Sequence, residues 1–134
     1  MAESLASLRK KGGGGMQETV LWTNPNPTTA MSATNITLSD DPTNYDFIGV
    51  QIRKANTSAG ALYAMFYMSS DDFVNVANET NGFGMAFFNG GYARKFRWNP
   101  SSNVVAVSST WRAGDSGTSN GTTIPQKVSG FRLK

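Results

Sequence analysis

The chain has 134 residues, no cysteine, no histidine and a formal net charge of +3. Its length suits a single domain that buries a sizeable core without disulfides. The missing residue types exclude disulfides, cysteine nucleophiles, Ser-His-Asp triads and histidine-bound zinc. An enzyme would need carboxylates, lysine or a cofactor. The sequence arranges none of these persuasively, so we expect neither catalysis nor a cofactor.

The positive charge is concentrated near the N-terminus. Arg9, Lys10 and Lys11, less Glu3, give +2 in residues 1–15, which leaves nine basic and eight acidic residues, or +1, in residues 16–134. A nucleic-acid-binding domain carries its basic stripe on the fold itself, so we expect no nucleic acid partner. No stretch approaches the roughly 20 apolar residues that span a bilayer, and no signal-peptide core is recognisable, so we expect no membrane association.

Residues 2–11 are predicted to form a short helix or extended arm, in which Leu5 and Leu8 make one apolar stripe. Such a short helix is marginal in water and needs a surface to dock on. Four glycines follow and are predicted to act as a hinge: Gly12, Gly13, Gly14 and Gly15. We therefore divide the chain into an anchor peptide with its linker, residues 1–15, and a domain, residues 16–134.

The N-terminal peptide allows three interpretations. Leu5, Leu8, Arg9, Lys10 and Lys11 are predicted to dock on an acidic or apolar groove of a larger particle, and the glycines let the domain face outward. Alternatively, copies of the peptide form a short bundle that nucleates a trimer. The third interpretation is a remnant of cloning, with Met16 as the natural start.

Strand patterns then recur at short spacing. Residues 18–23 alternate, with Val20 and Trp22 on one face, before a turn region rich in Pro and Asn at 23–29. Residues 34–38 place Ile36 and Leu38 together. Residues 45–54 are the clearest strand, and their alternation places three side chains on one face: Ile48, Val50 and Ile52.

The second half continues this pattern. Residues 61–70 are almost wholly apolar, as in a strand buried on both faces, and residues 71–78 alternate around Phe73. Residues 82–100 predict two strands joined across Asn89-Gly90-Gly91. In the second of these strands, one face is predicted to carry Tyr92, Arg94, Phe96 and Trp98, and the other Lys95 and Arg97. Residues 104–109 and 123–134 predict further strands, separated by a polar loop at 112–123.

Eight or nine short strands without an internal helix predict an all-β fold. We expect a single β-sandwich, of a jelly-roll-like type, behind a short N-terminal helix or arm.

Four phrases in this order carry a resemblance: "ETVLWTNPNPTT", "ITLSDDPTNYDFIGVQI", "ARKFRWNPSSNVVAVSS" and "TIPQKVSGFRLK". Together they resemble a small C-terminal domain class of bacteriophage tail and head-fibre proteins, over residues 17–134. The resemblance implies a virion surface protein that is oligomeric, often trimeric, and it supplies no catalytic residues. The chain shows no long shaft, which favours a small decoration protein over a tail fibre.

Three other candidate sites have simpler interpretations. The pairs Asp40-Asp41 and Asp71-Asp72 offer calcium ligands but lack the spacing of an ion-binding loop, so we expect turn formers. "RKFRW" at 94–98 interleaves basic and aromatic residues, as single-stranded nucleic acid sites do, but also fits a packed face beside a wet one. Trp111 and Arg112 open the long loop, where a tryptophan stacks on a sugar or protein partner or caps the core.

These observations predict a non-enzymatic bacteriophage structural protein on the virion surface, held to the capsid or another virion protein by residues 1–11. The alternative is a tail-fibre or receptor-binding module that recognises a host saccharide through loop aromatics and Asn or Asp side chains. A carboxylate-dependent glycan hydrolase is the least favoured interpretation.

Overall fold

The computed structural model describes residues 15–54, 62–77, 92–112, 120–121 and 123–134. The predicted hairpin turn at 89–91 lies outside these residues, as does the predicted N-terminal helix or arm. In chain order the elements are β1 (Met16–Thr23), β2 (Thr34–Thr37), η1 (Pro42–Asn44), β3 (Phe47–Lys54), β4 (Leu62–Ser69), α2 (Ser70–Ala77), β5 (Tyr92–Ala93), β6 (Phe96–Asn99), β7 (Val104–Val107), β8 (Trp111–Arg112) and β9 (Ile124–Leu133).

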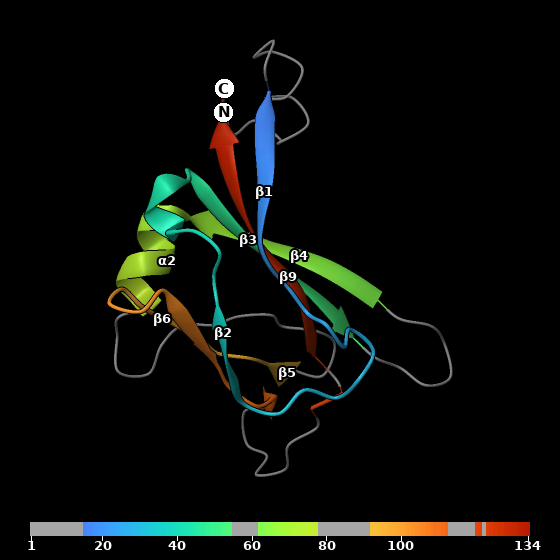
Figure 1. Cartoon of the computed structure of the whole chain (residues 1–134). Helices are drawn as coiled ribbons and strands as arrows, with labels where there is room; N and C mark the ends of the chain where they lie inside the picture. The colour runs from blue at the N-terminus through green and yellow to red at the C-terminus, as the bar shows by residue number, and fades with distance from the viewer. Residues whose placement is uncertain (1–14, 55–61, 78–91, 113–119, 122) are drawn as a thin grey trace.

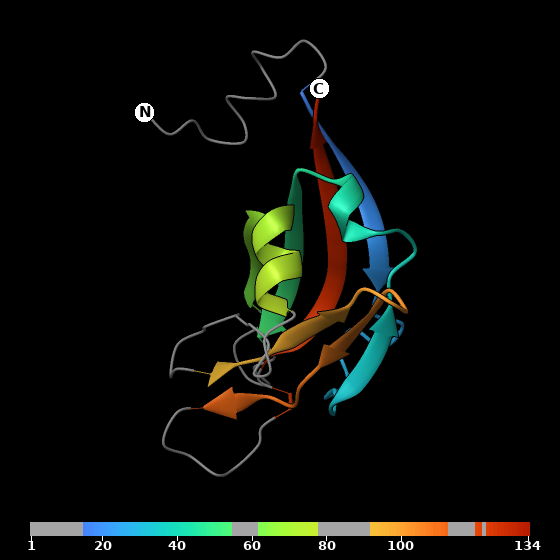
Figure 2. The ribbon, with the colours of Figure 1, turned by 90° about the vertical axis from the view of Figure 1, so that its left-hand side faces the viewer.

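The strands form a sandwich, which confirms the predicted all-β class. The large sheet has the strand order β1-β9-β3-β4 and is antiparallel throughout (Figure 1). The small sheet has the order β2-β7-β6, and β5 pairs with β8. Figure 2 shows the small sheet at the lower end of the large one and α2 nearer its upper end. The jelly-roll topology stays a prediction.

The core lies between the large sheet and the elements that cover it. Ile48, Val50 and Ile52 of β3 are almost wholly buried, so the predicted face of this strand is confirmed. Ile36 and Phe96 reach the same cluster from the small sheet. Every second residue of β3 therefore defines an inner face, and the residues between them define an outer face of the large sheet.

Residues 70–77 form a helix, so the prediction that the fold has no internal helix is wrong. Phe73, Val76 and Ala77 recur at the helical spacing i, i+3, i+4, although Val74 and Val76 also fit strand alternation. The Ser69 hydroxyl accepts a hydrogen bond from the Asp72 amide at the helix start, and Phe73 is fully buried. Capping and burial therefore favour the helix. Among the described residues, no helix has the length and apolar character that crossing a membrane requires.

Two strands differ in detail from the prediction. β4 lies at the edge of the large sheet. Contrary to the prediction, it is not buried on both faces, because Tyr63 and Tyr67 are exposed on the outer face. In β1 the pairing register with β9 shifts between Val20 and Trp22. This bulge turns Leu21 into the core and leaves Val20 44% exposed, so Val20 and Trp22 do not share one face.

Candidate functional site

The two ends of the described domain lie together at one end of the sandwich. Met16 pairs with Leu133 across β1 and β9, and the Gly15 carbonyl accepts a hydrogen bond from the Lys134 amide at 2.8 Å. Gly15 has φ 61°, a left-handed conformation that favours glycine. The last residue of the predicted hinge is thus tied to the sheet. The anchor residues 5–11 and the other hinge residues lie outside the described part.

A groove of about 450 Å³ lies where β1 ends, at the opposite end of the strand. It is lined by the end of β1, the loop over residues 24–33 and the start of β2. β1 has eight residues, and a strand rises about 3.3 Å per residue, so the groove lies roughly 25 Å from the terminal end. The described residues that line it include none with a charged side chain.

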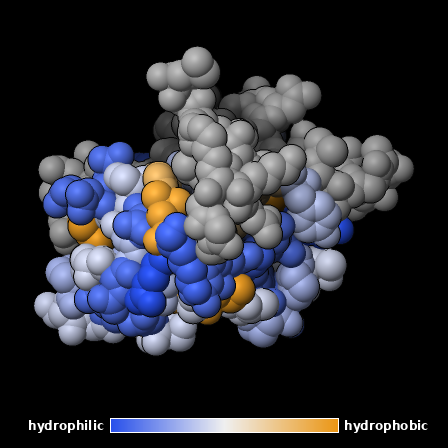
Figure 3. All heavy atoms as spheres, turned by 90° about the horizontal axis from the view of Figure 1, so that it is seen from above, coloured by the Kyte–Doolittle hydropathy of each residue, from blue (hydrophilic) through white to orange (hydrophobic). Residues whose placement is uncertain are grey.

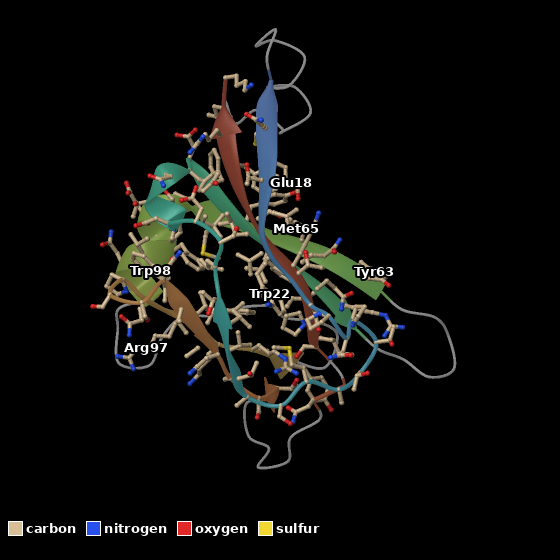
Figure 4. The ribbon with its side chains drawn as sticks, in the orientation of Figure 1. Glu18, Trp22, Tyr63, Met65, Arg97 and Trp98 are labelled. Carbon is tan, nitrogen blue, oxygen red and sulfur yellow. The ribbon has the colours of Figure 1, made fainter. Side chains whose placement is uncertain are left out.

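Trp22 is the aromatic residue of this groove. Figure 4 shows it near the lower end of β1, with Glu18 higher on the same strand. Its side chain is half-buried and packs against the core cluster, yet it also lines the groove. The sequence predicted a strand tryptophan but no groove. The only sequence signal was a tryptophan followed directly by a Pro/Asn-rich turn.

Asn24 shapes the groove from beneath. It is 7% exposed, and its Nδ2 donates to the carbonyl of Pro125 at 2.7 Å. Its Oδ1 accepts from the Asn26 amide at 2.7 Å, which starts the loop with an Asx turn. Proline lacks an amide donor and disturbs a central strand such as β9. At this disturbed part of β9, the Asn24 side chain supplies the hydrogen-bond donor for the Pro125 carbonyl.

The loop over residues 24–33 is tied down at further points. The Gln126 side-chain amide donates to the Pro27 carbonyl at 2.8 Å, and the Met31 amide donates to the Asn120 carbonyl at 3.3 Å. These hydrogen bonds fix the loop backbone and do not involve the side chains of the loop that line the groove.

Arg94 is the buried cation behind the groove. It is wholly buried, and its guanidinium donates to the carbonyls of Met31 (2.5 Å), Ser108 (2.7 Å), Asn120 (2.9 Å) and Thr123. Burial lowers the pKa of Arg94 to about 10, so the group remains charged at neutral pH. The sequence predicts that Arg94 shares a face with Phe96 and Trp98, and all three side chains are buried, but Arg94 lies between β5 and β6 and not within one continuous strand. The sequence did not reveal that the side chain gathers three loops around itself.

The outward side chains of the groove are free. Among the described residues, no hydrogen-bond partner is recorded for the side chains of Trp22, Asn26, Thr29, Ser32, Thr34 and Asn35. They present an aromatic surface and several hydroxyl and amide groups to the same hollow. A neutral ligand with both apolar and hydroxyl surfaces fits such a lining.

The groove continues onto the outer face of the small sheet. Asn35, Ala106 and Arg97 lie side by side on β2, β7 and β6, and Asn35 also lines the groove. Shallow hollows of about 400 and 440 Å³ flank Ala106. Arg97 projects from β6 in Figure 4, and it lines one of these hollows together with Lys95; both side chains are exposed.

The outer face of the large sheet is a second exposed surface. The four large hydrophobic side chains that are most exposed among the described residues all lie on it: Val20, Tyr63, Tyr67 and Leu133. Figure 4 shows Tyr63 and Met65 on β4 and Glu18 on β1. Viewed from the terminal end, the described surface is mainly hydrophilic, with separate hydrophobic patches (Figure 3). Tyrosine and methionine are enriched in protein–protein interfaces, so this face suits a protein partner.

An ion pair crosses this outer face. Lys127 Nζ lies 2.7 Å from Glu18 Oε1, and the Ser129 hydroxyl donates to the same oxygen at 2.8 Å. The hydrogen bond from Lys127 holds the pKa of Glu18 below its usual value, with Ser129 adding to the effect against the cost of burial. The pair places two charges on the part of this face that β1 and β9 form.

Asp40 and Asp41 serve a turn, as expected, whereas Asp71 and Asp72 begin a helix that was not predicted. Asp41 accepts a hydrogen bond from the Thr43 amide and caps η1. Asp40 accepts from the Tyr45 hydroxyl at 2.8 Å, and this bond is the main reason that the pKa of Asp40 is lowered. Asp71 and Asp72 occupy the first turn of α2. Within the described ranges, no three acidic, histidine or cysteine side chains cluster around a metal-sized space.

The basic and aromatic residues at 94–98 separate into two faces. Phe96 and Trp98 are 2% and 5% exposed, whereas Lys95 and Arg97 are exposed. The packed-face interpretation is confirmed, because base stacking needs accessible aromatic rings.

Trp111 and Arg112, the predicted ligand contacts, form β8. They pair with Ala93 and Tyr92 of β5. Their side chains lie outside the described part, as do residues 113–119 of the loop that follows.

Comparison with protein-family models and with curated proteins found no match for this chain. The functional proposal therefore rests on the groove, on the outer faces of the large and small sheets, and on the sequence resemblance.

Proposed function

We propose that this protein is a non-enzymatic structural protein on the surface of a bacteriophage particle, attached to the capsid or another virion protein through its N-terminal peptide. The single observation that carries the proposal is the placement of Met16 beside Leu133, which brings both ends of the domain to one end of the sandwich. A peptide that extends from this end and binds the particle would direct the opposite end of the domain, with the groove, away from the particle. The resemblance of the four sequence phrases to phage fibre domains supports the virion context.

The outer face of the large sheet supports the oligomeric part of the proposal. Tyr63 and Tyr67 are 59% and 47% exposed on an edge strand, and Leu133 lies next to the point where the N-terminal peptide leaves. In a homo-oligomer, with a trimer favoured, copies anchored side by side would cover this face. Replacing both tyrosines with serine should then reduce the mass measured by light scattering to that of a monomer. An unchanged mass would contradict this use of the face.

Deletion of residues 1–11 tests the attachment. The truncated protein should unfold at the same temperature as the full chain but no longer co-sediment with particles that lack the native protein. Leu5→Ser with Leu8→Ser should have the same effect, because these substitutions remove the apolar stripe. Ser4→Ala with Ser7→Ala is the matched control in the same peptide and should leave co-sedimentation unchanged. Full co-sedimentation of the deletion variant would contradict the proposal.

A second candidate function is receptor binding at the tip of a tail fibre, with a host saccharide as ligand. The groove favours it, because this uncharged hollow with free amide and hydroxyl groups lies at the end away from the termini. The two functions are compatible, since one concerns the anchored end and the other the free end.

A further inference from the structure

We infer that the groove around Trp22 is a binding site for a neutral saccharide. The inference assigns the ligand to this groove instead of to Trp111. It rests on the second candidate function, whose site and ligand class it names, and it is independent of the proposed N-terminal attachment, because every residue that would contact the ligand lies within 22–36.

The chemistry of the lining fits a sugar. A pyranose ring has faces rich in C–H groups and edges that carry hydroxyls, so its binding site needs an apolar plane with hydrogen-bonding groups around it. Trp22 supplies the plane and an indole N–H without a recorded partner in the described part of the chain. Asn26 and Asn35 flank it with side-chain amides that both donate and accept.

The charge of the lining selects the class of sugar. The groove residues that the structure describes include no Asp, Glu, Lys or Arg. A carboxylate or sulfate placed in the hollow would lose water without gaining a charged partner, which is costly. An uncharged hexose or N-acetylhexosamine carries no such cost. The volume of about 450 Å³ lies within the range of pockets for small ligands.

The groove is also preorganised. The Asn24 side chain donates to the Pro125 carbonyl and accepts from the Asn26 amide, and the Arg94 guanidinium donates to the Met31 carbonyl. These hydrogen bonds fix the loop backbone before a ligand binds, so the side chains that would contact the ligand start from a fixed backbone. Preorganisation lowers the entropy lost on binding.

The test uses the full chain and matched soluble probes: lactose, maltotriose and chitotriose as neutral sugars, and sialyllactose as the acidic relative of lactose. Binding is followed by saturation-transfer NMR and by titration of tryptophan fluorescence up to about 10 mM sugar, because single small-site affinities for such ligands are weak. We expect at least one neutral probe to bind and to shift the fluorescence of Trp22.

Variants locate the site. Asn26→Ala and Asn35→Ala should each weaken the bound neutral sugar about fivefold, the loss expected for one hydrogen bond. Trp22→Phe keeps an aromatic core contact but removes the indole, and it should abolish the fluorescence shift. Asn75→Ala, an exposed asparagine on α2, is the matched control and should bind as the native protein does. Unfolding temperatures confirm that each variant is folded.

Several results would overturn the inference. It fails if no neutral probe binds, or if only sialyllactose does. It also fails if neutral binding survives Asn26→Ala, Asn35→Ala and Trp22→Phe, or is lost in Trp111→Ala while these three variants retain it. None of these results bears on co-sedimentation with particles, so the attachment through residues 1–11 is judged separately.

Discussion

The two ends of the sandwich are held together by different means. At the terminal end, β1 and β9 pair in regular register, and the Tyr45 ring packs directly on Gly130 beneath the Arg132 guanidinium. At the groove end, the backbone is irregular, and polar side chains, above all Arg94 and Asn24, satisfy its carbonyls. At the groove end, the irregular loop over residues 24–33 and the adjoining ends of β1 and β2 gather uncharged polar side chains around one hollow. The loop that departs from regular strand pairing therefore shapes the groove.

The largest expected effect is at Arg94. Arg94→Met removes the guanidinium donors to the carbonyls of Met31, Ser108 and Thr123, and it should lower the free energy of unfolding by about 3–5 kcal/mol. Urea unfolding at pH 7 measures this. Arg97→Met, at an exposed arginine three residues later, is the control and should change stability by less than about 0.5 kcal/mol. Equal losses in the two variants would show that the buried cation does not hold the groove end.

The terminal end is tested by Gly130→Ala. A Cβ there would lie 2.4 Å from Cγ of Tyr45, whose hydroxyl is bonded to Asp40. Because the ring cannot move away freely, we expect a loss of about 2–3 kcal/mol from overpacking. Gly121→Ala is the control, since its new methyl would meet only Ala30 Cβ, at 3.8 Å. Thermal unfolding that is equally sensitive to both substitutions would contradict the close packing.

A smaller effect separates the supporting and the ligand-facing asparagines of the groove. Asn24→Ala should cost about 2 kcal/mol, because it removes the donor to the Pro125 carbonyl and the acceptor for the Asn26 amide. Asn26→Ala should leave stability nearly unchanged, since no partner of its side chain is recorded in the described ranges. Chemical denaturation of both variants measures the difference. A larger loss of stability in Asn26→Ala than in Asn24→Ala would contradict the assignment of Asn24 as the supporting residue.

The smallest effect concerns Glu18. Its pKa is lower in the folded state than in the unfolded chain, so its bond to Lys127 stabilises the fold above pH 4.5. This contribution is lost as the pH falls through the lowered folded pKa. The Glu18 side chain is 38% exposed, so Glu18→Gln should cost less than about 1 kcal/mol at pH 7. Urea unfolding at pH 7 and pH 3 should show the difference from the native protein fading at pH 3, and a constant difference would contradict the ion pair.

The sequence predicted those parts of the fold that depend on local alternation. Ile48, Val50 and Ile52 alternate so regularly that only one inner face was possible. The sequence predicts strand-like alternation over residues 71–78, because Val74 and Val76 alternate with Phe73 and Asn75. The cap at Ser69 and the packing of Phe73 decide in favour of the helix. The spacing of Ser69 and Asp72 is a local signal for a helix start, whereas the packing of Phe73 is not visible in the local pattern.

The groove was harder to predict, since it depends on contacts between distant residues. Asn24 bonds to Pro125, and Arg94 bonds to carbonyls from Met31 to Thr123. Alternation placed Arg94 on the face of Phe96 and Trp98 but could not name its hydrogen-bond partners. The bulge in β1 also changed which side chains face the core, because one extra residue inverts the alternation.

The most direct test of this account is an image of the intact particle at side-chain resolution. We predict density for residues 1–11 in contact with a virion protein, Met16 and Leu133 facing the particle, and the Trp22 groove open to solvent. Particles on which the groove end is buried against the shell, with residues 1–11 making no contact, would contradict the account.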